Sequence, residues 1–365
     1  MNKRTFASLI RGFVINLTNK PFIVTTDSAG NELVSSRAMC IEVSPNESEE
    51  SAAAIIRNTY NDWKKSNPGM DGKIILPSCV KFTTNGKVEA VYWINNDFDS
   101  VQKRITQKDD SPIIETPFTA NMTISDERAN VVKNKIALVT GGAQGIGEEI
   151  VRNLTSAGAF VFIADLNITG AKTLAQQVND REKRTAAIAV EVNVSNEESV
   201  EVMFDFVIQT AGCLDICISN AGVLKAGSVL EQELSEFKFV TDINYTGFFV
   251  ISKFAGRLLR TQHFSAPNWK TDIIQVNSKS GLEGSNKNGS YAGGKFGGIG
   301  LVSSFAKELI EYGIKVNAVC PGNFLDGPLW SDPENGLFVQ YLRSGKVPGA
   351  KTIIDVRAFY ESRVP

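Results

Sequence analysis

The stretch from Lys135 to Asp165 constrains the fold more than any other part of the sequence. It reads KIALVTGGAQGIGEEIVRNLTSAGAFVFIAD: an apolar strand pattern, a glycine-rich turn, a helix pattern and a second apolar strand. The alternation continues through LDICISNAG, DIIQVNS and IKVNAVCPG. Apolar strands that alternate with helices are typical of a parallel sheet covered by helices on both faces. We therefore expect an α/β domain with a doubly wound parallel sheet over residues 133–365.

The turn after the first of these strands carries Gly141, Gly145 and Gly147. The first glycine allows a tight turn, the second lets a pyrophosphate approach the backbone, and the third brings the helix close to the sheet. Asp165 follows about twenty residues later, where it can accept hydrogen bonds from ribose hydroxyls and repel a 2′-phosphate. A glycine-rich turn alone is compatible with a simple turn. In this context it predicts a Rossmann-like dinucleotide site, and NAD rather than NADP.

Six motifs in order resemble those of the short-chain dehydrogenase/reductase family. They are TGGAQGIG at 140–147, NAG at 220–222, Asn244, Ser278, the Tyr291/Lys295 pair and Pro321–Gly322. The resemblance covers about residues 130–365 and implies the catalytic residues Ser278, Tyr291, Lys295 and Asn244. It implies a cofactor site made of Thr140, Gly141, Gln144, Gly145, Ile146, Gly147, Asp165, Asn193, Val194, Asn220, Ala221, Gly222, Tyr291, Lys295, Pro321 and Gly322. Asn193 stands where the family usually has an aspartate, and we expect its amide oxygen to accept the same hydrogen bond from adenine.

Oxidation of a secondary alcohol requires a base for the hydroxyl proton. Tyr291 and Lys295 are four residues apart and therefore share one helix face. Free tyrosine titrates near pH 10, and we expect the Lys295 ammonium and the positive nicotinamide to lower the pKa of Tyr291. Ser278 is expected to hydrogen-bond the substrate oxygen, and the resemblance implies that Asn244 holds a water of a proton relay. An ordinary surface Tyr–Lys pair is the alternative interpretation.

Three further stretches concern the substrate. IIQVNSKSG, YAGGKFGGIGL and EYGIKVNAVCPGN are similar to family members that act on sugar-alcohol phosphates. The resemblance implies an NAD-dependent dehydrogenase that converts sorbitol 6-phosphate to fructose 6-phosphate. We expect Lys279, Lys287 and Arg343 to be the candidate phosphate ligands. Two alternatives stay open: another alcohol or ketone as substrate, and a catalytically weak NAD-binding interaction or sensor protein.

The segment GSYAGGKFGGIG, residues 289–300, contains six glycines in a helix pattern. Each costs a helix up to about 1 kcal/mol against alanine. Gly293 with Gly297, and Gly294 with Gly298, form a bare stripe that allows another backbone to approach. The resemblance implies a subunit two-fold there, and thus a homo-oligomer. Packing against a helix of the same chain is the alternative.

The rest of the chain has a different character. Residues 1–102 show a hairpin pattern, VKFTTNGKVEAVYWI, and a helix pattern, SPNESEESAAAIIRNTYNDWKKSN, which predict a small α+β domain. Residues 103–132 are polar and contain two prolines, as in a linker. Family members continue beyond AFYESRVP to a last strand, so we expect residues 133–365 to form a C-terminally truncated domain without that strand.

Composition excludes several classes of function. A net charge of −2 offers no attraction for nucleic acid or an anionic membrane, and no apolar run reaches the roughly 18–20 residues of a membrane span. His263 is the only histidine, which excludes a two-histidine metal site, and no metal is predicted. Five scattered cysteines do not suit a disulfide framework. We therefore expect a cytoplasmic enzyme with a small-molecule substrate.

Overall fold

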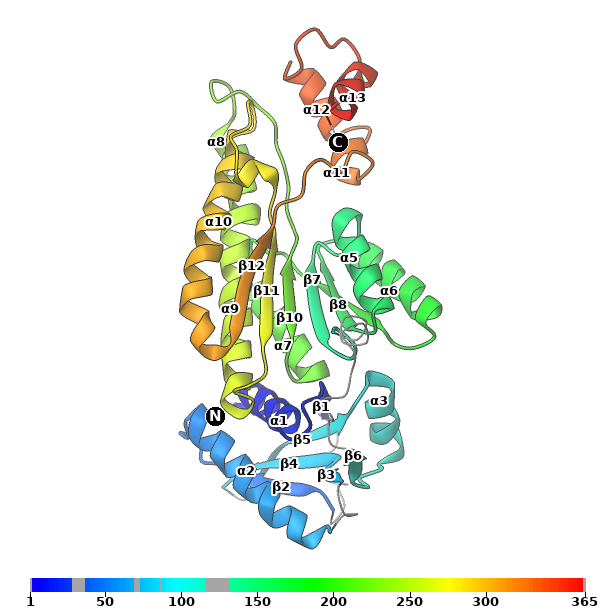
Figure 1. Cartoon of the computed structure of the whole chain (residues 1–365), viewed down its shortest axis with the longest axis vertical. Helices are drawn as coiled ribbons and strands as arrows, with labels where there is room; N and C mark the ends of the chain where they lie inside the picture. The colour runs from blue at the N-terminus through cyan, green and yellow to red at the C-terminus, as the bar shows by residue number, and fades with distance from the viewer. Residues whose placement is uncertain (1, 28–36, 69–72, 86, 116–130, 364–365) are drawn as a thin grey trace.

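The computed structural model describes residues 2–27, 37–68, 73–85, 87–115 and 131–363. Figure 1 shows an N-terminal unit at the bottom, a central sheet with its helices, and a small cluster of helices at the top. In the part of the chain that is described, no helix is both long and apolar enough to cross a lipid bilayer.

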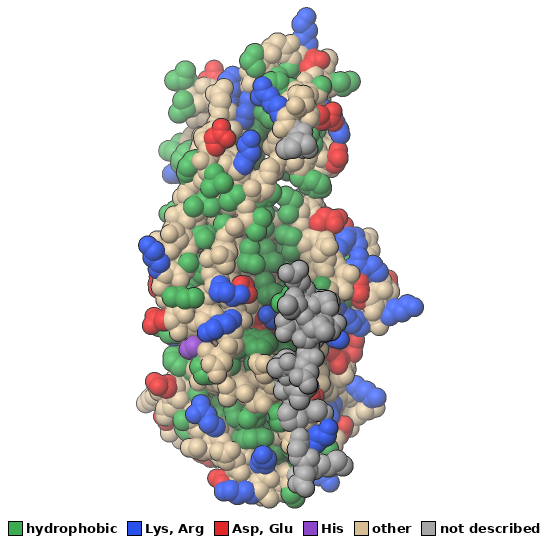
Figure 2. Space-filling view, in the orientation of Figure 1, with side chains coloured by type: hydrophobic (Ala, Val, Ile, Leu, Met, Phe, Trp, Pro, Cys, Tyr) green, Lys and Arg blue, Asp and Glu red, His purple; other side chains and the backbone are tan. Residues whose placement is uncertain are grey.

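The central sheet has six parallel strands in the order β12-β11-β10-β7-β8-β9. These are β7 (Ile136–Thr140), β8 (Phe160–Asp165), β9 (Ala187–Glu191), β10 (Ile216–Ser219), β11 (Thr271–Val276) and β12 (Ile314–Val319). The order reverses between β7 and β10, which confirms the predicted doubly wound, Rossmann-like fold. Among the described strands, β12 lies at one edge of this sheet and β9 at the other. On the face seen in Figure 2, hydrophobic side chains gather over β10 to β12.

Helices cover both faces of this sheet. On one face lie α5 (Gly145–Ser156) and α6 (Ile168–Glu182). On the other lie α7 (Glu197–Ala211), α9 (Gly247–Ser265) and α10 (Gly289–Leu309). The short α8 (Leu234–Thr241) leads through a π-helical turn (Asp242–Thr246) into α9. Every residue of β7 is buried because the strand is covered on both sides, which explains its unbroken apolar sequence.

The N-terminal unit contains a mixed sheet in the order β1-β5-β4-β2 and a small two-stranded sheet. The strands are β1 (Ile23–Asp27), β2 (Met39–Glu42), β3 (Ile74–Leu76), β4 (Cys79–Thr84), β5 (Lys87–Asn95) and β6 (Ile113–Glu115). The predicted hairpin is confirmed, since β4 and β5 pair antiparallel. The predicted helix is also confirmed as α2 (Glu49–Ser66), which begins where the Ser48 side chain accepts a hydrogen bond from Ser51 N.

The expected linker over 103–132 is wrong in its first part. Helix α3 (Phe98–Gln107) and strand β6 occupy it as far as Glu115. Of the charged residues in this stretch, Lys103 is exposed on α3, while Val101 of the same helix is fully buried. Residues 116–130 lie outside the described part, so the division of the chain into domains stays a prediction.

Helix α1 (Lys3–Thr18), which the sequence did not predict, joins the two units. It packs against α2 of its own unit and against α7 and α9 of the sheet domain. Its apolar side chains belong to one hydrophobic core that extends to α7, α9 and β11. Helix α1 is buried on nearly all sides, including at the polar residues Ser8 and Arg11.

The carboxyl-terminal residues form the cluster at the top of Figure 1. It consists of α11 (Pro328–Ser331), α12 (Leu337–Arg343) and α13 (Ile353–Glu361). Its core is built around Trp330, Phe338 and Tyr341. The cluster lies beyond the carboxyl ends of the parallel strands, where ligands of such sheets bind.

Candidate active site

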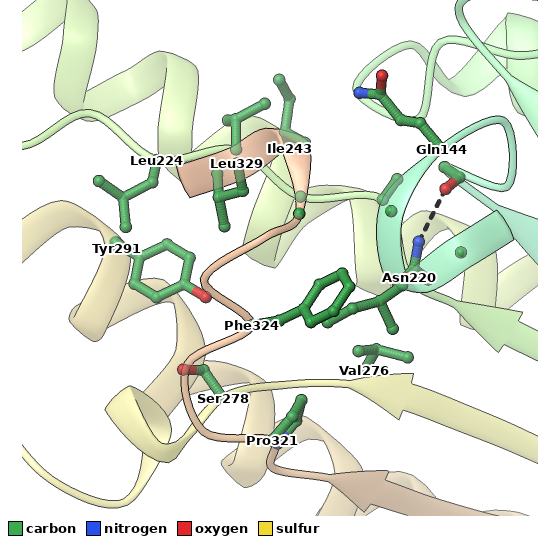
Figure 3. A pocket seen from close by; sticks show the side chains of 18 of the residues that line it. Gln144, Asn220, Leu224, Ile243, Val276, Ser278, Tyr291, Pro321, Phe324 and Leu329 are labelled. Carbon is green, nitrogen blue, oxygen red and sulfur yellow. Dashed lines mark hydrogen bonds between the residues drawn. The ribbon is translucent and has the colours of Figure 1, made fainter. Parts of the chain in front are cut away.

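A cavity of about 590 Å³ lies at the carboxyl ends of the strands, next to the helical cluster (Figure 3). It begins at the glycine turn and the end of β8, passes the 220–224 segment and the start of α10, and ends against α12. The reversal of strand order between β7 and β10 opens the sheet at this point.

The glycines of the turn are required by its geometry. Gly141 has φ +61°, and a Cβ there would lie 2.8 Å from the Ala221 Cα. A Cβ on Gly147 would lie 2.0 Å from the Gly141 carbonyl oxygen. Within the described residues the α5 N-cap, Gln144, makes no side-chain capping bond. The first N–H groups of α5 are thus open to an anion, which fits a dinucleotide pyrophosphate.

Thr140 was predicted to belong to the cofactor site, but it does not line the cavity. It is fully buried, and its hydroxyl accepts hydrogen bonds from the backbone N–H of Asn220 at 3.0 Å and of Ala221 at 3.1 Å. The Asn220 amide in turn donates to the Gly141 carbonyl at 2.9 Å. Thr140 therefore holds the 220–222 segment against the glycine turn. Every other predicted cofactor residue lines the cavity.

The side chains of Asp165 and Asn193 line the half of the cavity that begins at the glycine turn. The Asp165 carboxylate accepts from Ala143 N at 2.9 Å and from Asn167 N at 2.8 Å, one bond on each oxygen. Each oxygen keeps a lone pair for a ribose hydroxyl. The Asn193 oxygen accepts both the N–H and the hydroxyl of Ser195, at 3.1 and 2.7 Å. Both of its lone pairs are used, so the expected bond from adenine would have to displace Ser195.

The side chains predicted to be catalytic come from two neighbouring elements. Tyr291 lies in the first turn of α10, and Ser278 lies two residues beyond the end of β11. Figure 3 shows the Tyr291 hydroxyl pointing toward Ser278 within the cavity. The Lys295 ammonium lies 5.6 Å from the Tyr291 ring centroid and donates to the Val276 carbonyl at 2.9 Å. The structure thus brings together the predicted Ser, Tyr and Lys.

Asn244 lies behind the cavity wall. It occupies the π-helical turn between α8 and α9, an irregularity often found at functional sites. Its amide donates to the Val223 carbonyl at 2.8 Å and accepts from the Val223 N–H at 2.9 Å. These bonds hold the segment after Asn220–Gly222 in place. The predicted water relay through Asn244 stays a prediction.

The pKa of Tyr291 differs from the expectation. Burial of the phenol raises its pKa above 10, although the hydrogen bond with Ser278 lowers it. Burial also lowers the pKa of Lys295 to about 8. In the protein alone the expected lowering of the Tyr291 pKa is therefore absent, because the loss of hydration outweighs the hydrogen bond with Ser278.

The glycines of α10 divide into two groups. A Cβ on Gly297 would lie 2.7 Å from the Tyr245 ring, and one on Gly298 would lie 2.5 Å from the Gln275 amide. Gly294 packs on Asn244. Among the described residues, nothing approaches within 4 Å of a Cβ on Gly293. Most of the stripe therefore packs inside this chain, and only Gly293 faces outward at the centre of the segment.

The substrate end of the cavity contains residues that the sequence did not predict. The apolar ones are Leu224, Phe324, Leu329, Trp330 and Leu337, and the polar ones include Asn288 and Tyr341. They converge from three separate segments, and no spacing in the sequence links them. Among the described residues that line the cavity, Lys295 is the only Lys or Arg. The expected phosphate ligands Lys279, Lys287 and Arg343 lie outside it.

A family model described as short chain dehydrogenase matches residues 135–332. The chain belongs to the short-chain dehydrogenase/reductase family. Members of the family are NAD(P)-dependent oxidoreductases that act on CH–OH groups, and this chain is an enzyme of that class. The match leaves the N-terminal unit outside, which agrees with the predicted N-terminal extension.

Individual short-chain dehydrogenases resemble the chain over the same region. Sorbitol-6-phosphate 2-dehydrogenase of Escherichia coli is 32% identical over 197 residues, 54% of this chain and 74% of that protein. The 3-oxoacyl-[acyl-carrier-protein] reductase of Haemophilus influenzae is 29% identical and covers 63% and 92% of the two chains. The crystal structure of sorbitol-6-phosphate 2-dehydrogenase from Erwinia amylovora is 35% identical, with a TM-score of 0.56 over 63% and 84%.

Proposed function

We propose that this enzyme uses NAD to interconvert a secondary alcohol and a ketone, with Tyr291 as the acid–base group. One observation carries the proposal: the Tyr291 hydroxyl and Ser278 face each other in a cavity that begins at an open helix N-terminus. The cavity thus offers a place for an anionic cofactor and a proton-transfer group on the same path.

The residues of the cavity suggest how NAD would be held. The N–H groups at the start of α5, with Gly145 and Gly147, suit the pyrophosphate. Asp165 suits the adenine ribose, and its negative charge disfavours the 2′-phosphate of NADP. Pro321 and Gly322 lie near the Tyr291 end, where the nicotinamide would belong. When bound, the nicotinamide accepts or supplies the hydride.

The protein's own groups handle the proton. In the oxidation direction Tyr291 takes the proton of the substrate hydroxyl, and in the reverse direction it returns it. The Ser278 oxygen accepts the Ser280 N–H at 3.1 Å, and the Ser278 hydroxyl also shares a hydrogen bond with Tyr291. A substrate oxygen that enters between the two side chains would receive the Ser278 O–H in place of the Tyr291 oxygen. The Lys295 ammonium, held by the Val276 carbonyl, stabilises the phenolate. Asn244 positions the adjoining backbone.

For the substrate we propose a sugar-alcohol phosphate, with sorbitol 6-phosphate converted to fructose 6-phosphate. The named relatives from Escherichia coli and Erwinia amylovora support this choice. An unphosphorylated polyol is the second candidate. This candidate is favoured because proteins usually bind a phosphate through Lys or Arg side chains. Lys295 is the only Lys or Arg among the described residues lining the cavity.

We also propose that the enzyme works in the cytoplasm as a homo-oligomer. Its five cysteines are unpaired, as in proteins of reducing compartments. Two features of α10 support a subunit contact: Gly293 faces outward, and the nearby Phe296 is 46% exposed.

The test is an absorbance assay at 340 nm (the NADH band) with NAD or NADP and a panel of alcohols. The panel contains sorbitol 6-phosphate, sorbitol and 2-hexanol. We expect NAD-dependent turnover of the phosphate. Turnover of sorbitol with none of its phosphate would establish the second candidate. NAD binding without turnover of any alcohol would instead support the interaction or sensor alternative.

A further inference from the structure

A second buried phenol stands in the cavity. Tyr341, from α12, is only 3% exposed and lines the substrate end. Next to it is Asn288, the N-cap of α10, which is 2% exposed and also lines the cavity. Tyr291 packs against the same aromatic cluster as Tyr341. Buried polar groups lining a cavity of apolar walls are the ones that orient a ligand.

The direction of the hydrogen bonds at Asn288 follows from its neighbours. Only one orientation of its amide satisfies all of them. In that orientation its nitrogen donates to the Lys287 carbonyl at 2.8 Å, and its oxygen accepts from Lys346 Nζ at 2.7 Å and from the Tyr341 hydroxyl at 2.8 Å. The single proton of the Tyr341 hydroxyl is thus committed to Asn288, and the phenol oxygen is left as an acceptor.

Lys346 contacts both Asn288 and the ring of Tyr341. Its ammonium lies 4.0 Å from the Tyr341 ring centroid and also donates to Ser285 Oγ at 3.1 Å. Its donors are used by Asn288, Ser285 and the ring, so it fixes the amide and is not free for a substrate anion.

We propose that Tyr341 is a substrate-binding residue that accepts a hydrogen bond from a second hydroxyl of the substrate, away from the carbon that is oxidised. An acceptor selects a hydroxyl and repels a phosphate or carboxylate oxygen. The neighbouring walls, Leu224, Leu337 and Trp330, suit the carbon chain of such a substrate. The enzyme then selects polyhydroxylated over simple secondary alcohols. This inference rests on the proposed dehydrogenase function.

The first experiment compares two substrates in Tyr341→Phe. The ring and its packing against Trp330 (5.5 Å between centroids) are retained, and only the hydroxyl is lost. With sorbitol we expect kcat/KM to fall about 10-fold or more, mainly through KM. With 2-hexanol, which has no second hydroxyl, we expect no change. The matched control is Arg343→Gln on the same helix, which should leave both substrates unaffected. Equal losses on both substrates, or no loss on sorbitol, would overturn the proposal.

A binding measurement separates this inference from the proposed function. Trp330 lines the cavity, so its fluorescence reports on sorbitol added to the NAD-loaded protein, and Trp330→Phe identifies the signal. If no alcohol is turned over, the proposed function fails. The Tyr341 site still stands if Tyr341→Phe weakens sorbitol binding about 10-fold or more. The proposed role of Tyr341 is overturned if the affinity for sorbitol is unchanged in Tyr341→Phe, or if sorbitol does not change the Trp330 fluorescence of the parent.

Discussion

Arg11 of helix α1 and Asp215, directly before strand β10, form an ion pair in which both side chains are fully buried. Arg11 Nη2 lies 2.7 Å from Asp215 Oδ2. Arg11 Nε also donates to the Phe22 carbonyl at 2.7 Å. Asp215 further accepts from Ile136 N and Trp269 Nε1, both at 2.8 Å. The pair therefore links the N-terminal unit to the amino ends of the central strands, opposite the cavity.

Removing Arg11 is expected to destabilise the whole chain. Arg11→Met leaves the Asp215 carboxylate buried without its main counter-charge, which costs about 3–5 kcal/mol of the free energy of unfolding. Urea unfolding followed by circular dichroism measures this loss. The control is Arg4→Met on the same helix, where the ion pairs with Glu201 and Asp205 are at the surface and about 0–1 kcal/mol should be lost. Similar values for the two variants would show that the buried pair has no special role.

Tyr291→Phe is expected to abolish most of the activity. The ring stays in place, but the group that exchanges the proton is gone, so kcat should fall by about 10²–10⁴. NAD binding, followed by calorimetry, should change little because the glycine turn and Asp165 are untouched. A variant as active as the parent would contradict the assignment of Tyr291.

The stability of the chain is expected to depend on pH through Lys295. Its pKa is about 8 in the folded state and 10.5 for an unperturbed lysine. Between these values the unfolded chain binds more protons, so the free energy of unfolding rises with pH, by up to about 3 kcal/mol. Urea titrations at pH 7.5 and 10 measure the change.

Lys295→Met serves as the reference for this pH dependence. Lys346 also has a pKa lowered to about 8 by burial, and it titrates in both proteins. The difference between parent and variant therefore isolates Lys295. If both proteins gain the same stability between the two pH values, Lys295 is not the group responsible.

Asp165→Asn is expected to weaken the preference for NAD. The substitution removes the negative charge that repels a 2′-phosphate and keeps one acceptor for the backbone N–H groups. The ratio of kcat/KM for NAD to that for NADP should fall about 10-fold or more. Asn193→Ala, at a side chain engaged by Ser195, should leave the ratio nearly unchanged. An unaltered ratio in Asp165→Asn would argue against charge as the basis of selection.

Two glycine variants separate the subunit contact from internal packing. Gly293→Leu adds a side chain where the described chain has open space, so the fold should keep its stability while the homo-oligomer dissociates. Gly297→Leu meets the Tyr245 ring and should cost about 1–3 kcal/mol of stability. Analytical ultracentrifugation gives the mass of each. If the parent sediments as a monomer, or if the Gly293→Leu variant keeps the parent's mass, then Gly293 does not lie at a subunit contact.

The cofactor half of the site could be predicted because its geometry is local. A strand, a tight turn and a helix start follow one another in the chain, so Gly141, Gly147 and Asp165 could be identified from their spacing alone. Tyr291 and Lys295 share one helical turn for the same reason. The segments that contain Asn193 and Thr140 were predicted correctly, but the contacts of their side chains were not. Asn193 is bound by Ser195, and Thr140 is bound by the backbone of residues 220–222.

The sequence by itself determined the parallel sheet, the glycine turn and the shared helical turn of Tyr291 and Lys295, since these depend on periodicity and short spacings. The resemblance to the family implied that Ser278 joins them. Only the tertiary structure decided that α1 is buried against α9, that α3 and β6 replace part of a linker, and that Asn288, Tyr341 and Lys346 meet at the substrate end. Contacts between residues far apart in the chain depend on how whole elements pack. A buried pair such as Arg11 and Asp215, 204 positions apart, leaves no local pattern from which it could be predicted.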